Sequence, residues 1–444
     1  MPYQSFREYV QGTAKIGIGL GVLSILARWV TGITIFASPE ALMKYGIFGG
    51  IGYSMMGAFA MMAFGWLGRR VRSQFPDGLT IGDYFQYKLN KPGYWLMIAL
   101  LLLISVEGMF MQGMAAGVLL NILFHIPISI GMTCFFLLCV LFVGLGGISL
   151  IHRLAFVQVV LMFAVAILIP LYFFISKGAE HIYDGIRLYH PYLLVVNNHD
   201  GLFFTVTGLL IGFGQVFADQ ASWQRLYMLE RKKIVPTFLL SGVIWATIPL
   251  TFSSLIIVVI YTGGFHDIYS VLSGLIHKID TLFLLILFIC CALGAIVSAF
   301  SAGLHSMIGL IVGNIYPHFR PQADEKMKMR LSYAMAVLIG FISFALTVNF
   351  TPTLLDLVFF FGIIYSSMLV PFIVIVLSKK KTGTFVPLSS WLGLAAGYAV
   401  YTSVGPLGAI WISMIVSTLL VIISLSVKLI RQHLHASREC IREP

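Results

Sequence analysis

Long apolar runs separated by short polar connections dominate the chain. An apolar run of about 20 residues is long enough to cross a bilayer as a helix, and the chain holds twelve runs of roughly this kind. They occupy residues 16–38, 46–68, 94–124, 128–145, 150–175, 201–217, 236–262, 281–314, 328–350, 354–378, 386–402 and 406–430. The connections leave no room for a soluble catalytic domain. The pattern therefore predicts an all-α integral membrane protein that forms one transmembrane unit over residues 1–444.

Two of these runs are interrupted by glycine at membrane depth. Gly32 interrupts the run 16–38, and Gly212 and Gly214 interrupt the run 201–217. Unwound backbone is tolerated inside a membrane only where protein or water satisfies its polar groups. Broken helices at corresponding places in two halves of a membrane protein point to the midplane binding site of a secondary transporter.

The spans divide into two groups of five that have similar lengths. The first group covers residues 16–175 and the second covers residues 201–378. Each group contains an odd number of crossings, so the two groups have opposite orientations, as in an inverted repeat. The two remaining spans, within residues 386–430, are then a C-terminal appendage.

Charge follows membrane topology. The chain is 59% hydrophobic and only 10% charged, with a net charge of +11, and its mean hydropathy is +0.96. If the N-terminus is cytoplasmic, 23 of the 28 Lys and Arg residues fall on the cytoplasmic side, which is the positive-inside rule. We therefore expect a multi-pass protein of the cytoplasmic membrane with both termini cytoplasmic. No cleavable signal peptide is apparent, because the first apolar run is long and has no small-residue cleavage pattern.

Several function classes find no support in the sequence. The basic residues form no patch with interleaved aromatic residues, which argues against nucleic-acid binding. The chain contains no HExxH pair, no GxSxG elbow and no Walker loop, which argues against intramembrane proteolysis and ATP-driven transport. The expected partners are a small-molecule solute and membrane lipid, and no oligomeric state is predicted.

Three motifs in order along the chain resemble the sodium:solute symporter family, whose members share the LeuT-type five-plus-five inverted repeat. They are Gly146-Gly147 followed by Gln158, Asp219-Gln220 followed by Gln224-Arg225, and the run VSAFSAGLHSMIGLIVGNIY at 297–316, in which Asn314 replaces the family's Asp. The likeness extends from residue 10 to about residue 430. The family usually has an extra helix before the first repeat, and this chain starts where that helix would end.

The resemblance implies a sodium site between the first and eighth helices. Its ligands would be the backbone carbonyls of Ala27 and Val30 and two adjacent hydroxyls, of which the first is at Ser298, and Ala295 is a further member of the expected site. The second position is Ala299, so one oxygen is missing. A desolvated hard cation needs about five or six oxygen ligands, so the sodium site is expected to be degenerate.

An arginine stands between the two carbonyl-donating residues of the first helix. An arginine at the centre of a helix costs at least ~2.5–3.5 kcal/mol to insert, so Arg28 needs an anion or a wet cavity. Its guanidinium could supply the positive charge that sodium supplies elsewhere in the family. Position 155, where the family often has an Asp, is also apolar here. These features favour weakened or lost sodium coupling, and the alternative is that Arg28 extends its charge to the cytoplasmic interface.

Glu107 is the only acid in the interior of the first five spans. Ionisable groups inside a membrane are functional-site candidates by default. Glu107 could carry a proton during the cycle or form a charge pair with Arg28. The alternative is a hydrogen-bonded carboxyl without a role in transport. H⁺ and Na⁺ are therefore both possible coupling ions, and no other cofactor is implied.

A third group of residues, at the breaks in the first and sixth helices, is expected to contact the substrate or to gate its access. Its members are Gly32, Gly212, Gly214, Gln215, Asp219, Gln220, Gln224 and Arg225. Gln215 stands where the family often has an aromatic gate, and its amide could contact substrate or satisfy carbonyls freed by the glycines. Asp219 and Arg225 are expected at the cytoplasmic end of the sixth span, as an intracellular gate or a helix-end pair.

Together these features predict a secondary active transporter of a small organic solute, with the solute bound between spans one, three, six and eight. Two alternatives stay open. One is a proton-coupled or uncoupled carrier with a degenerate sodium site, and the other is a non-transporting membrane sensor on the same fold. The fold does not fix the substrate.

Overall fold

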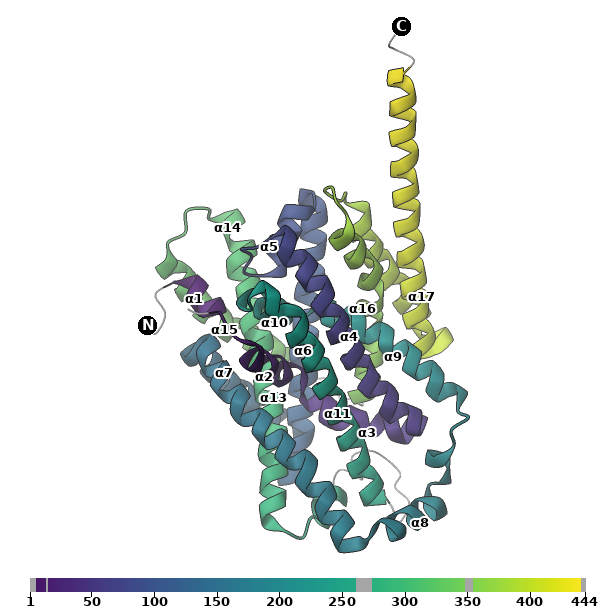
Figure 1. Ribbon diagram of the computed structural model, residues 1–444. Coiled ribbons are helices and arrows are strands. Elements are labelled where there is room, and N and C mark those ends of the chain that lie inside the picture. Colours follow the sequence, from purple (N-terminus) through teal and green to yellow (C-terminus); the bar gives the residue numbers. More distant parts are fainter. Residues whose placement is uncertain (1–4, 13–14, 261–273, 348–353, 441–444) are drawn as a thin grey trace.

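The computed structural model describes residues 5–12, 15–260, 274–347 and 354–440. Over these residues the chain is almost entirely helical, and the long helices pack side by side in one bundle (Figure 1). The C-terminal helix extends well beyond this bundle.

The first part of the bundle covers the described residues from Ser5 to Leu194. Its helices are α1 (Phe6–Gln11), α2 (Ile18–Trp29), α3 (Gly32–Tyr45), α4 (Ile47–Gln74), α5 (Ile81–Lys88), α6 (Lys91–Phe124), α7 (Ile128–Lys177) and α8 (Ala179–Tyr189), followed by the 3-10 turn Pro191–Leu194.

The second half follows the same scheme of long helices joined by short turns. It contains α9 (His199–Ala218), α10 (Gln220–Met228), the 3-10 turn Arg231–Lys233, α11 (Ile234–Ile260), a helical segment at 274–278, α13 (Leu282–Leu310), the π turn Ile311–Ile315, α14 (Tyr316–Phe319), α15 (Glu325–Thr347), α16 (Leu354–Leu377) and α17 (Phe385–Cys440).

The helices agree with the predicted apolar runs. Over the described residues, each of the twelve runs coincides with a helix, with part of one or with two consecutive helical elements; the last residues of the runs 236–262 and 328–350 lie outside the described residues. Two pairs of runs are joined, one within α7 and one within α17, and α17 is kinked at Gly405, where φ is +76°. By length and composition, nine of the described helices could cross a membrane, or ten if the bent pair α2 and α3 is one span.

The first predicted helix break is confirmed. α2 and α3 meet at an angle of 63°, and the backbone between them is extended at Val30 and Thr31. Thr31 caps α3 by accepting a hydrogen bond from the backbone N–H of Thr34. A Cβ on Gly32 would lie 2.5 Å from Ile296 and 2.8 Å from Ala115. Glycine is therefore required here because α3 passes so close to α6 and α13.

Side chains from neighbouring helices satisfy the backbone groups that this break leaves free. Gln112 of α6 accepts from the Gly32 N–H at 3.1 Å, Gln158 of α7 donates to the Val30 carbonyl at 3.0 Å, and the Trp245 indole of α11 donates to the Trp29 carbonyl at 2.9 Å. Protein side chains therefore satisfy these interior backbone groups at the break, as is expected inside a membrane.

The second break lies elsewhere than predicted. α9 continues through Gly212 and Gly214 to Ala218, and the chain leaves helical geometry at Asp219 before α10 begins. The two glycines instead permit close packing. A Cβ on Gly212 would lie 2.2 Å from the Met56 carbonyl oxygen, and one on Gly214 would lie 2.2 Å from the Tyr365 carbonyl oxygen. In sequence, a glycine that breaks a helix and a glycine that lets another helix approach look alike.

Candidate functional site

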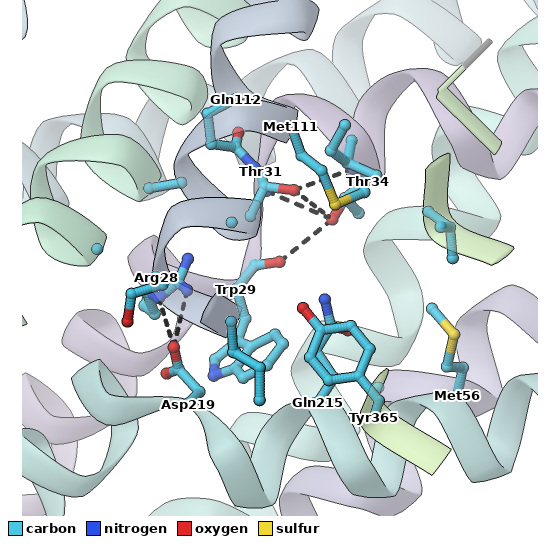
Figure 2. A pocket seen from close by; sticks show the side chains of 18 of the residues that line it. Arg28, Trp29, Thr31, Thr34, Met56, Met111, Gln112, Gln215, Asp219 and Tyr365 are labelled. Carbon is cyan, nitrogen blue, oxygen red and sulfur yellow. Dashed lines mark hydrogen bonds and ion pairs between the residues drawn. The ribbon is translucent and has the colours of Figure 1, made fainter. Parts of the chain in front are cut away.

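A small cavity lies beside the break between α2 and α3. Its volume is about 70 Å³, and its walls come from α2, α3, α4, α6, α9, α10, α11, α13 and α16. Its polar lining includes Arg28, Gln112, Gln215, Asp219 and Tyr365 (Figure 2). The broken first helix and the interrupted sixth span therefore meet at one internal polar site.

Arg28 and Asp219 form an ion pair across this site. The Arg28 Nη2 lies 2.7 Å from the Asp219 Oδ1, and the Arg28 Nε lies 3.2 Å from the same oxygen. The two side chains are only 15% and 8% exposed. The other oxygen of Asp219 accepts from the backbone N–H of Ser222 at 2.8 Å and from its hydroxyl at 2.6 Å. Asp219 is therefore both the N-cap of α10 and the counterion of Arg28.

This pair corrects two predictions. The proposed charge pair between Arg28 and Glu107 is wrong, because the guanidinium binds Asp219 instead. Asp219 also lines the central cavity, whereas the sequence placed it at the cytoplasmic end of the sixth span. The reason is the position of the break, because the last turn of α9 ends at Ala218 and leaves Asp219 in the unwound segment.

The remaining polar residues of the sixth-helix motif mostly join helices. Gln220 lines the cavity, and its amide donates to the Leu101 carbonyl at 2.9 Å and the Ser105 hydroxyl at 2.7 Å, both on α6. Arg225, which is 2% exposed, donates from Nε to the carbonyl and the hydroxyl of Ser24 at 2.9 Å each. Arg225 thus fixes α10 to α2.

Gln224 and Gln215 lie in different environments. Gln224 is buried against α13, where a Cβ on Gly309 would lie 2.5 Å from its amide nitrogen. Gln215 lines the cavity, and its side chain lies next to the Tyr365 hydroxyl (Figure 2). Of these two, only Gln215 stands where it could contact a solute.

The residues implied for the cation site are brought together in part. The Ser298 hydroxyl donates to the Ala27 carbonyl at 3.2 Å, so α13 and the break in the first span do meet at the expected register. Ala295 is buried one turn before Ser298, and the side chain of Ala299 lines the cavity without an oxygen.

Both first-helix carbonyls of this site already accept hydrogen bonds from protein. Ala27 accepts from Ser298, and Val30 accepts from the Gln158 amide. With the missing hydroxyl at position 299, the residues present offer fewer oxygens than the five or six or so that a hard cation prefers. The donor set therefore fits Na⁺ poorly in this conformation.

Glu107 lies in the interior of α6 and is 2% exposed. Its Oε2 accepts a hydrogen bond from the hydroxyl of Tyr365 on α16. Among the described residues, its Oε1 is buried without a hydrogen-bond partner. Glu107 is thus a buried carboxyl with a single polar contact to another helix.

Sequence reasoning missed three residues that shape the site. Gln112 is an isolated polar residue in an apolar run, and that isolation is a signal that could have found it. Tyr365 and Trp245 gave no such signal, because aromatic residues are frequent throughout the apolar runs. Their roles depend on which helices pack together.

Comparisons with known proteins agree with this architecture. The chain matches the model of the sodium:solute symporter family over residues 9–391. It is 24% identical over 419 residues to the osmoregulated proline transporter OpuE of Bacillus subtilis, covering 90% of this chain and 84% of that protein. It is 20% identical over 383 residues to the probable urea active transporter 1 of Schizosaccharomyces pombe, covering 76% of this chain. The chain spans only 55% of that yeast protein's length.

Two solved structures share the fold. One is a Na⁺-coupled sialic acid symporter in a substrate-bound outward-open state, with a TM-score of 0.79 and 13% identity over 94% of this chain and 91% of that one. The other is Mhp1, a nucleobase-cation-symport-1 family transporter in a closed conformation, with a TM-score of 0.58 and 13% identity over 96% and 95% of the two chains. The fold is thus LeuT-like, as the sequence motifs predicted. Because the family model matches most of the chain, the chain belongs to the sodium:solute symporter family, a family of membrane transporters rather than enzymes.

Proposed function

We propose that this protein is a secondary active transporter that carries a small organic solute through the cavity between the two interrupted helices. One observation carries the proposal. A polar internal cavity stands where the α2–α3 break meets the unwound residue Asp219, and an ion pair joins the two. Discontinuous helices that converge on a midplane site are the construction that secondary transporters use for binding.

The charge of the cavity indicates the class of solute. Arg28 and Asp219 neutralise each other, and Gln112 and Gln215 add uncharged amide groups to the wall. A solute with a net charge would be desolvated there without a counterion, which is costly. We therefore propose a compact solute without net charge. Urea is neutral and proline is a zwitterion at neutral pH, so the solutes named for the two relatives both meet this condition.

The transport cycle that we propose is alternating access by two inverted repeats, residues 16–175 and 201–378, that rock against each other. Each proposed repeat begins with an interrupted helix, α2–α3 in one and α9–α10 in the other. We place the protein in the cytoplasmic membrane with cytoplasmic termini. In support, α5 and α14, next to basic residues expected inside, lie at the end of the bundle opposite α8 (Figure 1).

Sodium is the coupling ion that membership of the family suggests. The incomplete oxygen set at Ala27, Val30 and Ser298 supports a weak sodium dependence in this chain. We therefore propose that the sodium gradient contributes little to solute accumulation.

Counterflow in proteoliposomes tests the transport function directly. Vesicles loaded with unlabelled solute should accumulate the labelled form without any ion gradient, for a panel of neutral and zwitterionic solutes led by urea and L-proline. Asp219→Asn should reduce this exchange at least tenfold, whereas Glu230→Gln, on a carboxyl that is 52% exposed, should not change it. Absence of counterflow and of gradient-driven uptake across the panel would overturn the proposal and favour a sensor.

A further inference from the structure

Glu107 is a buried carboxyl that the solute site does not use directly. It is 2% exposed, its Oε2 accepts from the Tyr365 hydroxyl, and its Oε1 is without a partner among the described residues. A buried polar atom that lacks a partner in a native fold calls for an explanation in terms of function, water or an ion.

The groups around Glu107 leave its negative charge uncompensated. Among the described residues, the charged or titratable groups that act on it are Arg28 of α2, Asp219 at the start of α10, Tyr365 of α16 and Tyr398 of α17. The first two pair with each other, and the two phenols are neutral. The other helices packed on α6, among them α7, α13 and α15, present no further described group of this kind to Glu107.

An unpaired carboxylate in such a place is expensive. Removing an ion from water without a counterion costs several kcal/mol even after relaxation, and the usual outcome is that the group takes up a proton instead. A protonated Glu107 accepts from Tyr365 through one oxygen and keeps its proton on the other. The hydrogen bond from Tyr365 by itself favours the ion, but a single hydrogen bond does not replace the lost hydration of a buried charge, so burial without a counterion favours the acid form.

Glu107 is also connected to the solute cavity through its neighbours. Its near neighbours Ser105 and Gly108 line the cavity, and so does its partner Tyr365. Tyr365 is held from the other side by α9, because Gly214 packs directly on its carbonyl and Gln215 lies next to its hydroxyl (Figure 2). Any movement of α9 and α16 relative to α6 therefore changes the bond between Tyr365 and Glu107.

We propose that Glu107 is the proton-binding site of this transporter and that one proton moves with the solute in each cycle. The inference rests on the proposed transport function and deepens it by naming the coupling ion. In one state Glu107 holds a proton and accepts from Tyr365. When the helices shift, the O–H bond breaks, the proton passes to water in the cavity, and the carboxylate is reprotonated from the opposite side.

Proton flux in proteoliposomes tests the proposal. With Na⁺ absent, an acidic external medium should drive solute accumulation, and solute addition should acidify vesicles that contain the pH dye pyranine. Glu107→Gln cannot release a proton, so gradient-driven accumulation should fall at least tenfold, and exchange, which needs no net proton movement, should fall less. The matched control Glu230→Gln should behave as wild type in both assays.

A second variant separates coupling from structure. Tyr365 is a positioning residue, so Tyr365→Phe should shift the pH profile of uptake, whereas a purely structural role would lower uptake equally at every pH. The proposal is overturned if wild-type vesicles show counterflow but no solute-linked proton movement, or if Glu107→Gln keeps full proton-driven accumulation. Absence of counterflow in the wild type would overturn the transport function itself. The proton flux of the wild type tests the proposal by itself, so the test does not depend on whether a variant folds.

Discussion

Two buried carboxyl groups lie close to the same cavity in very different surroundings. Asp219 has a guanidinium at 2.7 Å, a backbone N–H at 2.8 Å and a hydroxyl at 2.6 Å. Glu107 has one phenol and an oxygen without a partner among the described residues. Asp219 also caps the N-terminus of α10, where the helix dipole favours a negative charge.

The difference shows how one protein gives two acids separate tasks. Asp219 is stabilised as an ion, and it joins the break in the first span to the break in the sixth. Glu107 is not stabilised as an ion, so it is the group that can gain and lose a proton when its surroundings change. The same substitution, acid to amide, should therefore cost much stability at Asp219, and should abolish proton coupling with little loss of stability at Glu107.

The largest effect on stability is expected for Asp219→Asn. This substitution leaves the Arg28 charge buried without its counterion, which costs about 3–5 kcal/mol when one partner of a buried pair is removed. Titration of the detergent-solubilised protein with SDS, followed by tryptophan fluorescence, measures the loss. The double variant Arg28→Gln with Asp219→Asn should recover part of it. Purely additive losses would show that the pair does not stabilise the fold.

A second substitution disturbs Glu107 through its partner. A Cβ at position 214 would lie 2.2 Å from the Tyr365 carbonyl oxygen, so Gly214→Ala should push α16 away from α9. Overpacking of this kind costs about 1–3 kcal/mol. We expect that loss in the SDS titration together with a changed pH profile of uptake. A matched control is Gly19→Ala, where an added Cβ meets nothing within 4 Å. Wild-type stability in Gly214→Ala would contradict the close packing.

Ala299→Ser tests whether the poor sodium site makes Glu107 necessary. The new hydroxyl would restore the oxygen that is missing beside Ser298. We expect the half-saturating Na⁺ concentration for stimulation of uptake to fall about tenfold, equivalent to ~1.4 kcal/mol. Ala302→Ser, also on α13 and buried, is the control. If wild-type uptake already depends strongly on Na⁺ and Ala299→Ser changes nothing, the interpretation of a weak sodium site is wrong.

Glu107→Gln should have a small effect on stability in contrast to Asp219→Asn. A glutamine has the shape of the protonated acid and keeps an oxygen that can accept from Tyr365. We expect a loss of about 1 kcal/mol or less, the usual net contribution of one hydrogen bond. The same SDS titration provides the measurement. A loss as large as that of Asp219→Asn would mean that Glu107 is ionised in the folded protein.

The smallest effect is expected for an exposed ion pair that serves as a reference. The Lys44 Nζ lies 3.4 Å from the Asp356 Oδ1, but the two side chains are 48% and 45% exposed. Exposed pairs contribute about 0–1 kcal/mol and are screened by salt. Lys44→Ala should therefore leave both stability and uptake within error of wild type. A loss comparable to Asp219→Asn would remove burial as the explanation for the difference between the pairs.

Local pattern was enough to predict the class of fold. The twelve apolar runs, the break near Gly32 and the order of the three motifs all follow from residue type and spacing, because a bilayer demands long apolar helices and penalises free backbone. The register of Ser298 against Ala27 could also be predicted, since it follows from the family motifs on α2 and α13. Glu107 and Arg28 stood out as ionisable groups in apolar runs.

Pairing between distant residues was decided only by the tertiary structure. The sequence alone could not show whether Arg28 would meet Glu107 or Asp219, because the three residues lie far apart in the chain and the answer depends on where α9 ends. It also could not distinguish glycines that break a helix from Gly212 and Gly214, which admit a neighbouring backbone. The role of Tyr365 could be recognised only from the packing of α16 against α6. Local composition determines which segments enter the membrane, whereas the packing of helices far apart in sequence determines which buried charge is compensated.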